Sequence, residues 1–231
     1  MTEKQTTGFR TTGTPDVRDA RAAVDFAKLD PREQLRVMLR DHVVGKPFSE
    51  LNAVTFDHRA AAVMGHVMLD ALEDAGYSVD DFDAVGALTA AAVPLVSAMI
   101  HAAASRGEDL DGFVMDFVYP SIKGPSIKNR RVVLVDAWLS EKSYVQTSSL
   151  VTLRNGNELS LDFGVVEAQG AEVVAITSLV GGVGDAGESA GSAGSAGSAG
   201  GNAVIEVINP VADEQRSLPF VPVFDESELN A

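Results

Sequence analysis

The chain has 231 residues, of which 45% are hydrophobic and 22% are charged, a balance typical of one globular domain with a substantial core. Its 33 acidic and 18 basic side chains give a formal net charge of −15 at pH 7, which argues against nucleic acid or an anionic membrane as a partner. The absence of cysteine excludes disulfides, thiol nucleophiles and cysteine-ligated metals.

The ends of the chain and its most apolar stretch bear on its location. Residues 85–104 carry Pro94, His101 and hydroxyl side chains, whereas a membrane span needs about 20 strongly apolar residues. The polar N-terminus does not resemble a signal peptide, so we expect a cytoplasmic protein. We also expect residues 1–28 to form a flexible segment ahead of a domain that spans 29–231. The histidines lack the spacing of a metal site, and no metal is expected.

Apolar periodicity predicts alternating helices and strands. Asp30 followed by a proline and Glu33 is a helix start, with Asp30 as the capping residue. Helical spacing predicts helices at 30–45, 57–74, 89–104 and 159–169, and apolar runs predict strands at 82–86, 112–119, 131–138, 171–179 and 204–208. Strands that alternate with helices in this way predict an α/β fold with a parallel sheet.

Two segments depart from this alternation. Residues 148–161 alternate apolar and polar side chains on both sides of Asn155-Gly156, which predicts a β-hairpin; the competing interpretation starts the following helix at about Asn157. Residues 181–201 contain Ser-Ala-Gly repeats, which cannot form a core and predict a flexible surface loop inside the domain.

An acid after four aliphatic residues at the end of a predicted strand, here Asp136, resembles the motif with which type I phosphoribosyltransferases bind phosphoribosyl pyrophosphate (PRPP). Residues 85–94 resemble the pyrophosphate loop of the orotate phosphoribosyltransferases. Residues 100–114, 122–132, 167–174 and 218–229 are similar to other segments of these enzymes. The resemblance spans about residues 29–229 and implies the type I phosphoribosyltransferase fold, a parallel sheet with helices on both faces.

The resemblance also implies a relict ligand site. It makes Asp136 a ribose ligand, Thr89 part of the pyrophosphate loop, and Asn155, Gly156 and Asn157 a displaced phosphate loop. Each residue has a structural alternative: Asp136 and Thr89 as caps of the elements that follow them, and the Asn-Gly pair as a hairpin turn. The resemblance implies no cofactor except Mg²⁺, and that only if PRPP is bound. It leaves the catalytic residues unassigned.

Several positions depart from the family pattern. Ala137 replaces the second ribose-binding acid, residues 138–144 lack the glycines of the phosphate loop and add Glu141, and Met115-Asp116 stands where an Arg-Lys pair is expected. The reaction needs cations to neutralise the departing pyrophosphate. We therefore predict an impaired or repurposed binding or regulatory paralogue, with a nucleotide-like or phosphorylated ligand, that forms a homodimer or a heteromer with an active homologue. The alternative is an active orotate phosphoribosyltransferase.

Overall fold

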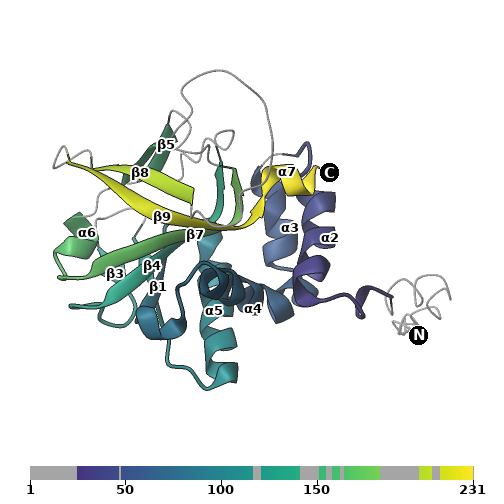
Figure 1. Cartoon of the computed structure of the whole chain (residues 1–231), viewed down its shortest axis with the longest axis horizontal. Helices are drawn as coiled ribbons and strands as arrows, with labels where there is room; N and C mark the ends of the chain where they lie inside the picture. Colours follow the sequence, from purple (N-terminus) through teal and green to yellow (C-terminus); the bar gives the residue numbers. More distant parts are fainter. Residues whose placement is uncertain are drawn as a thin grey trace, which may run out of the picture.

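The structure is a computed structural model that describes residues 25–46, 48–116, 121–140, 151–154, 158–161, 164–182, 203–209 and 214–230. Most of the predicted N-terminal segment and of the Ser-Ala-Gly loop therefore lies outside the described residues. All described strands belong to one nine-stranded sheet with the order β3-β2-β1-β4-β7-β9-β8-β6-β5 (Figure 1). The strands are β1 (Ala84–Ala87), β2 (Asp111–Met115), β3 (Ile122–Lys123), β4 (Arg131–Ser140), β5 (Val151–Arg154), β6 (Glu158–Leu161), β7 (Glu172–Gly182), β8 (Ala203–Asn209) and β9 (Glu214–Asp225).

The centre of the sheet is parallel. Strands β2, β1, β4, β7 and β9 run in one direction, while β3 pairs antiparallel with β2 and β8 pairs antiparallel with β9. The near-continuous apolar composition of β4, whose described side chains from Val132 to Leu139 are buried, is typical of a central strand covered on both faces. The predicted α/β fold with a parallel sheet is confirmed.

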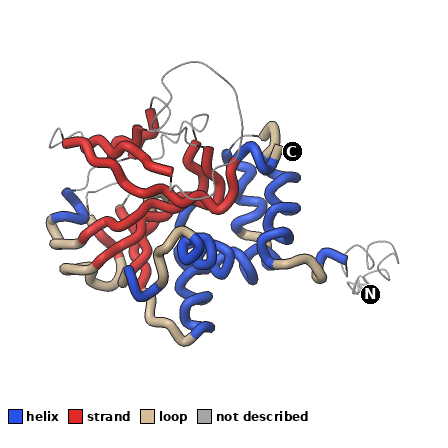
Figure 2. The backbone as a smooth tube through the Cα atoms, viewed as in Figure 1, coloured by secondary structure: helices blue, strands red, loops and turns tan. Residues whose placement is uncertain are grey.

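Helices cover the two faces unequally (Figures 1 and 2). Helices α2 (Pro31–Val43), α4 (His58–Asp74) and α5 (Val93–Arg106) pack their apolar sides on one face, together with the short α3 (Asn52–Thr55) and α7 (Glu226–Leu229). The opposite face carries the four-residue α6 (Gly164–Glu167) and a second hydrophobic cluster. None of the described helices is long and apolar enough to cross a membrane.

The predicted helix starts are confirmed by their caps. Asp30 accepts a hydrogen bond from the backbone N–H of Glu33 at 3.0 Å, and Asp57 accepts one from the N–H of Arg59 at 2.8 Å. These carboxylates satisfy backbone donors that have no partner within the helix. The Arg59 side chain also bonds to Asp57 and, with its N–H, holds the pKa of that carboxyl well below its usual range.

The strand expected at 112–119 ends at Met115. Two predicted helix starts were also wrong. The helix expected at 159–169 is limited to α6, because residues 158–161 form β6, which pairs antiparallel with β5 and parallel with β8. The alternating apolar and polar pattern thus indicated a strand. The hairpin interpretation holds for β5 and β6, the two strands on either side of residues 155–157. The helix expected from Thr89 begins at Val93, after a 3₁₀ turn over Ala90–Ala92.

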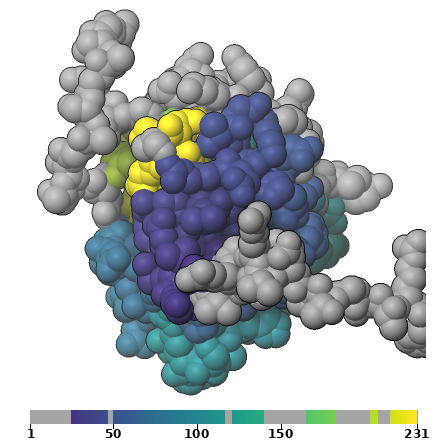
Figure 3. Space-filling model, turned by 90° about the vertical axis from the view of Figure 1, so that its right-hand side faces the viewer, coloured from purple at the N-terminus to yellow at the C-terminus, as the bar shows by residue number. Residues whose placement is uncertain are grey.

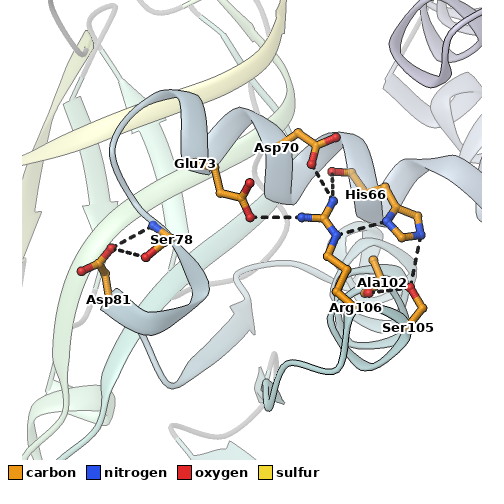
Figure 4. A network of polar contacts seen from close by, with 8 residues as sticks. All are labelled: His66, Asp70, Glu73, Ser78, Asp81, Ala102, Ser105 and Arg106. Carbon is orange, nitrogen blue, oxygen red and sulfur yellow. Dashed lines mark hydrogen bonds and ion pairs between the residues drawn. The ribbon is translucent and has the colours of Figure 1, made fainter.

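A close contact and a polar network join α4 to α5. Gly65 lies so close to α5 that a Cβ there would meet the backbone carbonyl oxygen of Ala98. Arg106, at the end of α5, binds Asp70 and donates hydrogen bonds to Nδ1 of His66 at 3.3 Å and to the carboxylate of Glu73 at 3.1 Å (Figure 4). One guanidinium therefore holds three consecutive turns of α4.

Replacing Arg106 with methionine should lower the free energy of unfolding by about 1 kcal/mol. The variant loses two ion pairs whose acids are half-exposed, so each contributes little, and two hydrogen bonds to His66, one to its ring and one to its carbonyl oxygen. Urea unfolding monitored by circular dichroism measures the loss. Arg40→Met, on the exposed side of α2, is the control and should change stability by less than about 0.5 kcal/mol. Equal losses in the two variants would contradict the role of Arg106.

Candidate functional site

The order of the sheet places a topological switch point between β1 and β4. From β1 the chain moves to β2 on one side, then returns to form β4 on the other. Ligands of such sheets bind at the carboxyl ends of the strands that flank this point. Leu88, which directly follows β1, donates its backbone N–H to the carbonyl of Val135 at 2.9 Å. This bond brings the turn after β1 against the side of β4.

Thr89 and Asp136 meet at this point. The Thr89 hydroxyl donates to Oδ1 of Asp136 at 2.7 Å, although the two residues are 47 positions apart. Both residues are 0% exposed. The same Oδ1 accepts the backbone N–H of Ala137 at 2.7 Å, while Oδ2 is buried without a hydrogen-bond partner. Two of the residues that the sequence singled out therefore form one enclosed polar pair.

The enclosure of Asp136 changes its acidity. Burial raises the pKa of this carboxyl to about 6, because the charged form loses its contact with water. The hydrogen bonds from Thr89 and from the backbone of Ala137 and Trp138 act in the opposite direction but do not cancel it. Among the residues that the structure describes, no lysine or arginine contributes to the pKa of Asp136. The carboxyl of Asp136 is thus poorly solvated, and no described cation acts on it.

Neither structural alternative describes the pair fully. Thr89 occupies the capping position of the 3₁₀ turn, but its hydroxyl bonds to Asp136 and not to that turn's backbone. Asp136 binds the N–H of the next residue, but no turn follows. Strand β4 continues to Ser140, with Trp138 opposite Val180 of β7. Extended chain therefore lies where the resemblance places the start of a phosphate loop.

The predicted displaced phosphate loop, Asn155, Gly156 and Asn157, lies outside the described residues. The strands on either side of it are described and pair antiparallel, with Arg154 opposite Glu158. They stand at the far end of the sheet from the switch point, because β7, β9 and β8 separate β6 from β4. At about 4.8 Å per strand, that separation is roughly 19 Å. The phosphate-binding role of these three residues stays a prediction.

Basic side chains near the parallel strands bind acids of this chain. Arg130 pairs with Asp111 at 3.1 Å, and Arg131 pairs with Asp83 at 3.5 Å, both near the amino ends of the strands. At the carboxyl end of β2, Asp116 pairs with Lys123 at 3.6 Å. This acid occupies part of the position where the resemblance expects an Arg-Lys pair. Arg130 and Arg131 thus lie at the amino ends of the parallel strands, whereas Asp136 lies toward their carboxyl ends.

The C-terminal helix α7 packs near the carboxyl end of β4, and the sequence did not predict it. The indole N–H of Trp138 donates to the carboxylate of Glu226 in α7, and Trp138 is buried. Arg32 and Arg36 of α2 each bind Oε2 of Glu228 at 3.3 Å. Helices α2 and α7 consequently lie against each other, as Figure 3 shows. The carboxylate of Asp225, which caps α7, was the one available sequence signal for this helix.

Comparison with known proteins decides the family. No protein-family model matches the chain. An orotate phosphoribosyltransferase of Streptomyces coelicolor is 36% identical over 151 residues, which cover 63% of this chain and 72% of that protein. One from Tropheryma whipplei is 32% identical over 139 residues, or 58% of this chain and 56% of that protein. The chain belongs to the orotate phosphoribosyltransferase family.

Solved structures agree with this family in fold. The orotate phosphoribosyltransferase of Mycobacterium tuberculosis in complex with inorganic phosphate has a TM-score of 0.55 and 21% identity, with 90% of this chain and 95% of that chain covered. The complex of that enzyme with PRPP has a TM-score of 0.52, 22% identity and coverage of 86% and 91%. A phosphoribosyltransferase of Corynebacterium diphtheriae has a TM-score of 0.51, 18% identity and coverage of 88% and 100%. The predicted phosphoribosyltransferase fold is therefore confirmed.

Proposed function

We propose that this chain is a catalytically impaired or repurposed member of the orotate phosphoribosyltransferase family that acts as a binding or regulatory protein. The observation that carries the proposal is the enclosed Thr89–Asp136 pair. A ribose hydroxyl can reach the Asp136 carboxylate only after the Thr89 hydroxyl and the surrounding side chains move. The continuation of β4 to Ser140 adds to this, because it replaces the loop whose free N–H groups would hold a phosphate.

The residues at this site do not fit Mg²⁺ bound with PRPP. The ion takes ionised carboxylates and phosphate oxygens in an octahedral arrangement. Asp136 offers one enclosed carboxyl whose pKa is raised to about 6, and Ala137 stands where the family has a second acid. No Mg²⁺-dependent step is therefore assigned. A nucleotide-like or phosphorylated ligand remains part of the proposal, held without the metal.

The proposal includes an assembly and a location. We place the protein in the cytoplasm, as a homodimer or as a heteromer with an active homologue. Exposed apolar side chains on the helical side of the molecule support an assembly: Phe56 is 74% exposed, and Val37 and Val44 of the α2 region are partly exposed. Light scattering on the purified chain, alone and mixed with an active relative, measures both forms.

Titration with PRPP and Mg²⁺ should give no heat of binding, and incubation with orotate should give no turnover. The reason is that the Asp136 carboxylate is enclosed, and that none of the described lysines or arginines acts on it to help neutralise pyrophosphate. Isothermal calorimetry and a spectrophotometric orotate assay make the two measurements. The Streptomyces coelicolor relative serves as the positive control. Micromolar binding together with turnover would contradict the proposal.

The second candidate is an active orotate phosphoribosyltransferase. Its support is the family membership and the position of the Thr89–Asp136 pair at the switch point of the sheet. In that case the pair must open to admit ribose. Turnover would then be present in the unmodified chain and lost in Asp136→Asn, with the folded state unchanged by circular dichroism. If neither protein turns over orotate, this candidate is rejected.

A further inference from the structure

Strands β7 and β9 pair along only part of their length. Their register begins with Ile176 opposite Phe220 and continues to Gly181 opposite Asp225. Before that point β9 follows β8 instead, from Glu214 to Phe220. Figure 1 shows the two strands separating toward the end of the sheet where β7 begins. Pro219 directly precedes the first residue of β9 that pairs with β7.

A pocket of about 320 Å³ lies where the strands separate. We call it the β7–β9 wedge and define it by its lining residues, Glu167, Ala171, Glu172, Val173, Arg216 and Leu218. This volume is at the lower end of the range for ligand pockets. The wedge is at the amino end of β7, whereas Thr89 and Asp136 lie toward the carboxyl ends of the parallel strands. It is therefore a different site from the switch point.

The walls of the wedge are two strand edges that do not pair with each other. Residues 172, 173 and 175 of β7 pair with β4 on one side, with a register shift at Val174, and residues 214–219 of β9 pair with β8 on one side. Alternate backbone N–H and C=O groups of each strand point to its other side, which faces the wedge. Such an edge is a template for pairing with a further extended chain.

The side chains that line the wedge indicate which peptide side chains it would bind. Ala171, Val173 and Leu218 are at least partly buried and form an apolar lining for alternate side chains. Arg216 binds Glu167, so this basic group already has an acid. Glu172 is exposed and makes no ion pair among the described residues. The wedge consequently has one carboxylate in excess, which favours a basic side chain.

We propose that the β7–β9 wedge binds a short extended peptide segment carrying lysine or arginine, by adding it as a strand to the open edge of β7. Backbone hydrogen bonds supply the binding energy, and Glu172 supplies the preference for the basic side chain. The wedge shares no lining residue with the Thr89–Asp136 pair, so the proposal does not depend on any phosphoribosyl chemistry.

The test uses the full chain and a fluorescein-labelled peptide, Lys-Val-Thr-Val-Lys-Val-Thr, titrated by fluorescence anisotropy. We expect saturable binding that weakens about tenfold or more when alternate backbone nitrogens are methylated, since methylation removes the edge donors. Glu172→Lys should weaken binding about tenfold. Asp74→Lys, at an exposed acid on α4, is the matched control and should leave binding unchanged. Hydrogen exchange should slow at residues 172–175 when the peptide is bound.

Three results would overturn the proposal. They are no anisotropy change up to about millimolar protein, equal binding of the methylated peptide, or equal weakening by Asp74→Lys and Glu172→Lys. The last result would mean that the peptide responds to the overall negative charge of the chain and not to the wedge. Circular dichroism of both variants establishes that the fold is retained, so a loss of binding can be assigned to the site.

Discussion

Asp136→Asn should stabilise the protein at neutral pH by about 1 to 3 kcal/mol. Burial raises the pKa of this carboxyl from 3.8 to about 6, so folding must enclose a charge whenever the pH is above that value. A pKa difference of this size corresponds to about 3 kcal/mol in the free energy of unfolding. The asparagine oxygen can still accept from Thr89, and its amide takes the position of Oδ2, which already lacks a partner. The buried, unpaired amide is why the gain is smaller than the full difference.

The pH dependence of Asp136 has a definite sign. Because the folded pKa is the higher one, the folded protein takes up a proton before the unfolded chain does as the pH falls. The cost of the buried charge is therefore present above about pH 6 and disappears between about pH 6 and 3.8. Urea unfolding of both proteins at pH 7.5, 5 and about 4 should give a stability difference that shrinks toward the lowest pH.

Asp83→Asn is the matched control for this experiment. The backbone N–H of Arg131 is the main cause that lowers the pKa of Asp83, so this carboxylate stabilises the fold when charged. The control variant should therefore lose stability at neutral pH, opposite in sign to Asp136→Asn. A destabilised Asp136→Asn would contradict the prediction. It would mean that the charged form of Asp136 is well solvated or paired in the folded protein.

Gly65→Ala should destabilise the protein by about 3 kcal/mol or more. The added Cβ would lie 2.1 Å from the carbonyl oxygen of Ala98 and 2.9 Å from the backbone nitrogen of Met99. Those atoms belong to the backbone of α5 and cannot rotate away, so the two helices must separate. Thermal unfolding at fixed pH measures the effect, with roughly 2–4 °C expected per kcal/mol for a chain of this size.

Helix propensity predicts the opposite sign, so the measured change in stability distinguishes the steric effect from propensity. Alanine is better than glycine inside a helix by about 1 kcal/mol, so α4 considered alone should gain stability from Gly65→Ala. The control is Ala62→Gly on the exposed side of α4, which should cost about 1 kcal/mol through propensity only. If Gly65→Ala is neutral or stabilising, then α4 and α5 are not in the close contact described for them.

The sequence predicted the fold well where local pattern and burial agree. The run of four aliphatic residues before Asp136 is a strand in any environment that covers both of its faces, and Asp30 is a cap by its chemistry. Thr89 and Asp136 were each placed at the carboxyl end of a predicted strand, without a prediction that the two strands are neighbours. Their hydrogen bond could not be predicted, because it depends on how the turn after β1 folds against β4.

The remaining features depend on contacts between distant segments. Short elements such as α3 and α7 have too few residues for a periodic pattern, and α7 is held by Arg32 and Arg36 from the other end of the chain. The β7–β9 wedge follows from the place where β9 changes partner. That place can be located only when the pairing of both strands is known.

The long ladder between β4 and β7 limits what the chain after Asp136 can form. Residues 138–140 are paired with residues 180–182, so the chain beyond Asp136 is an integral part of the sheet. Placing a glycine or an acid here by a point mutation would leave this pairing in place, and the backbone would still follow β7. A phosphate loop directly after Asp136 and the β4–β7 ladder are therefore mutually exclusive, because the same backbone groups cannot pair with β7 and hold a phosphate. Forming such a loop would require several substitutions and the loss of three ladder pairs together.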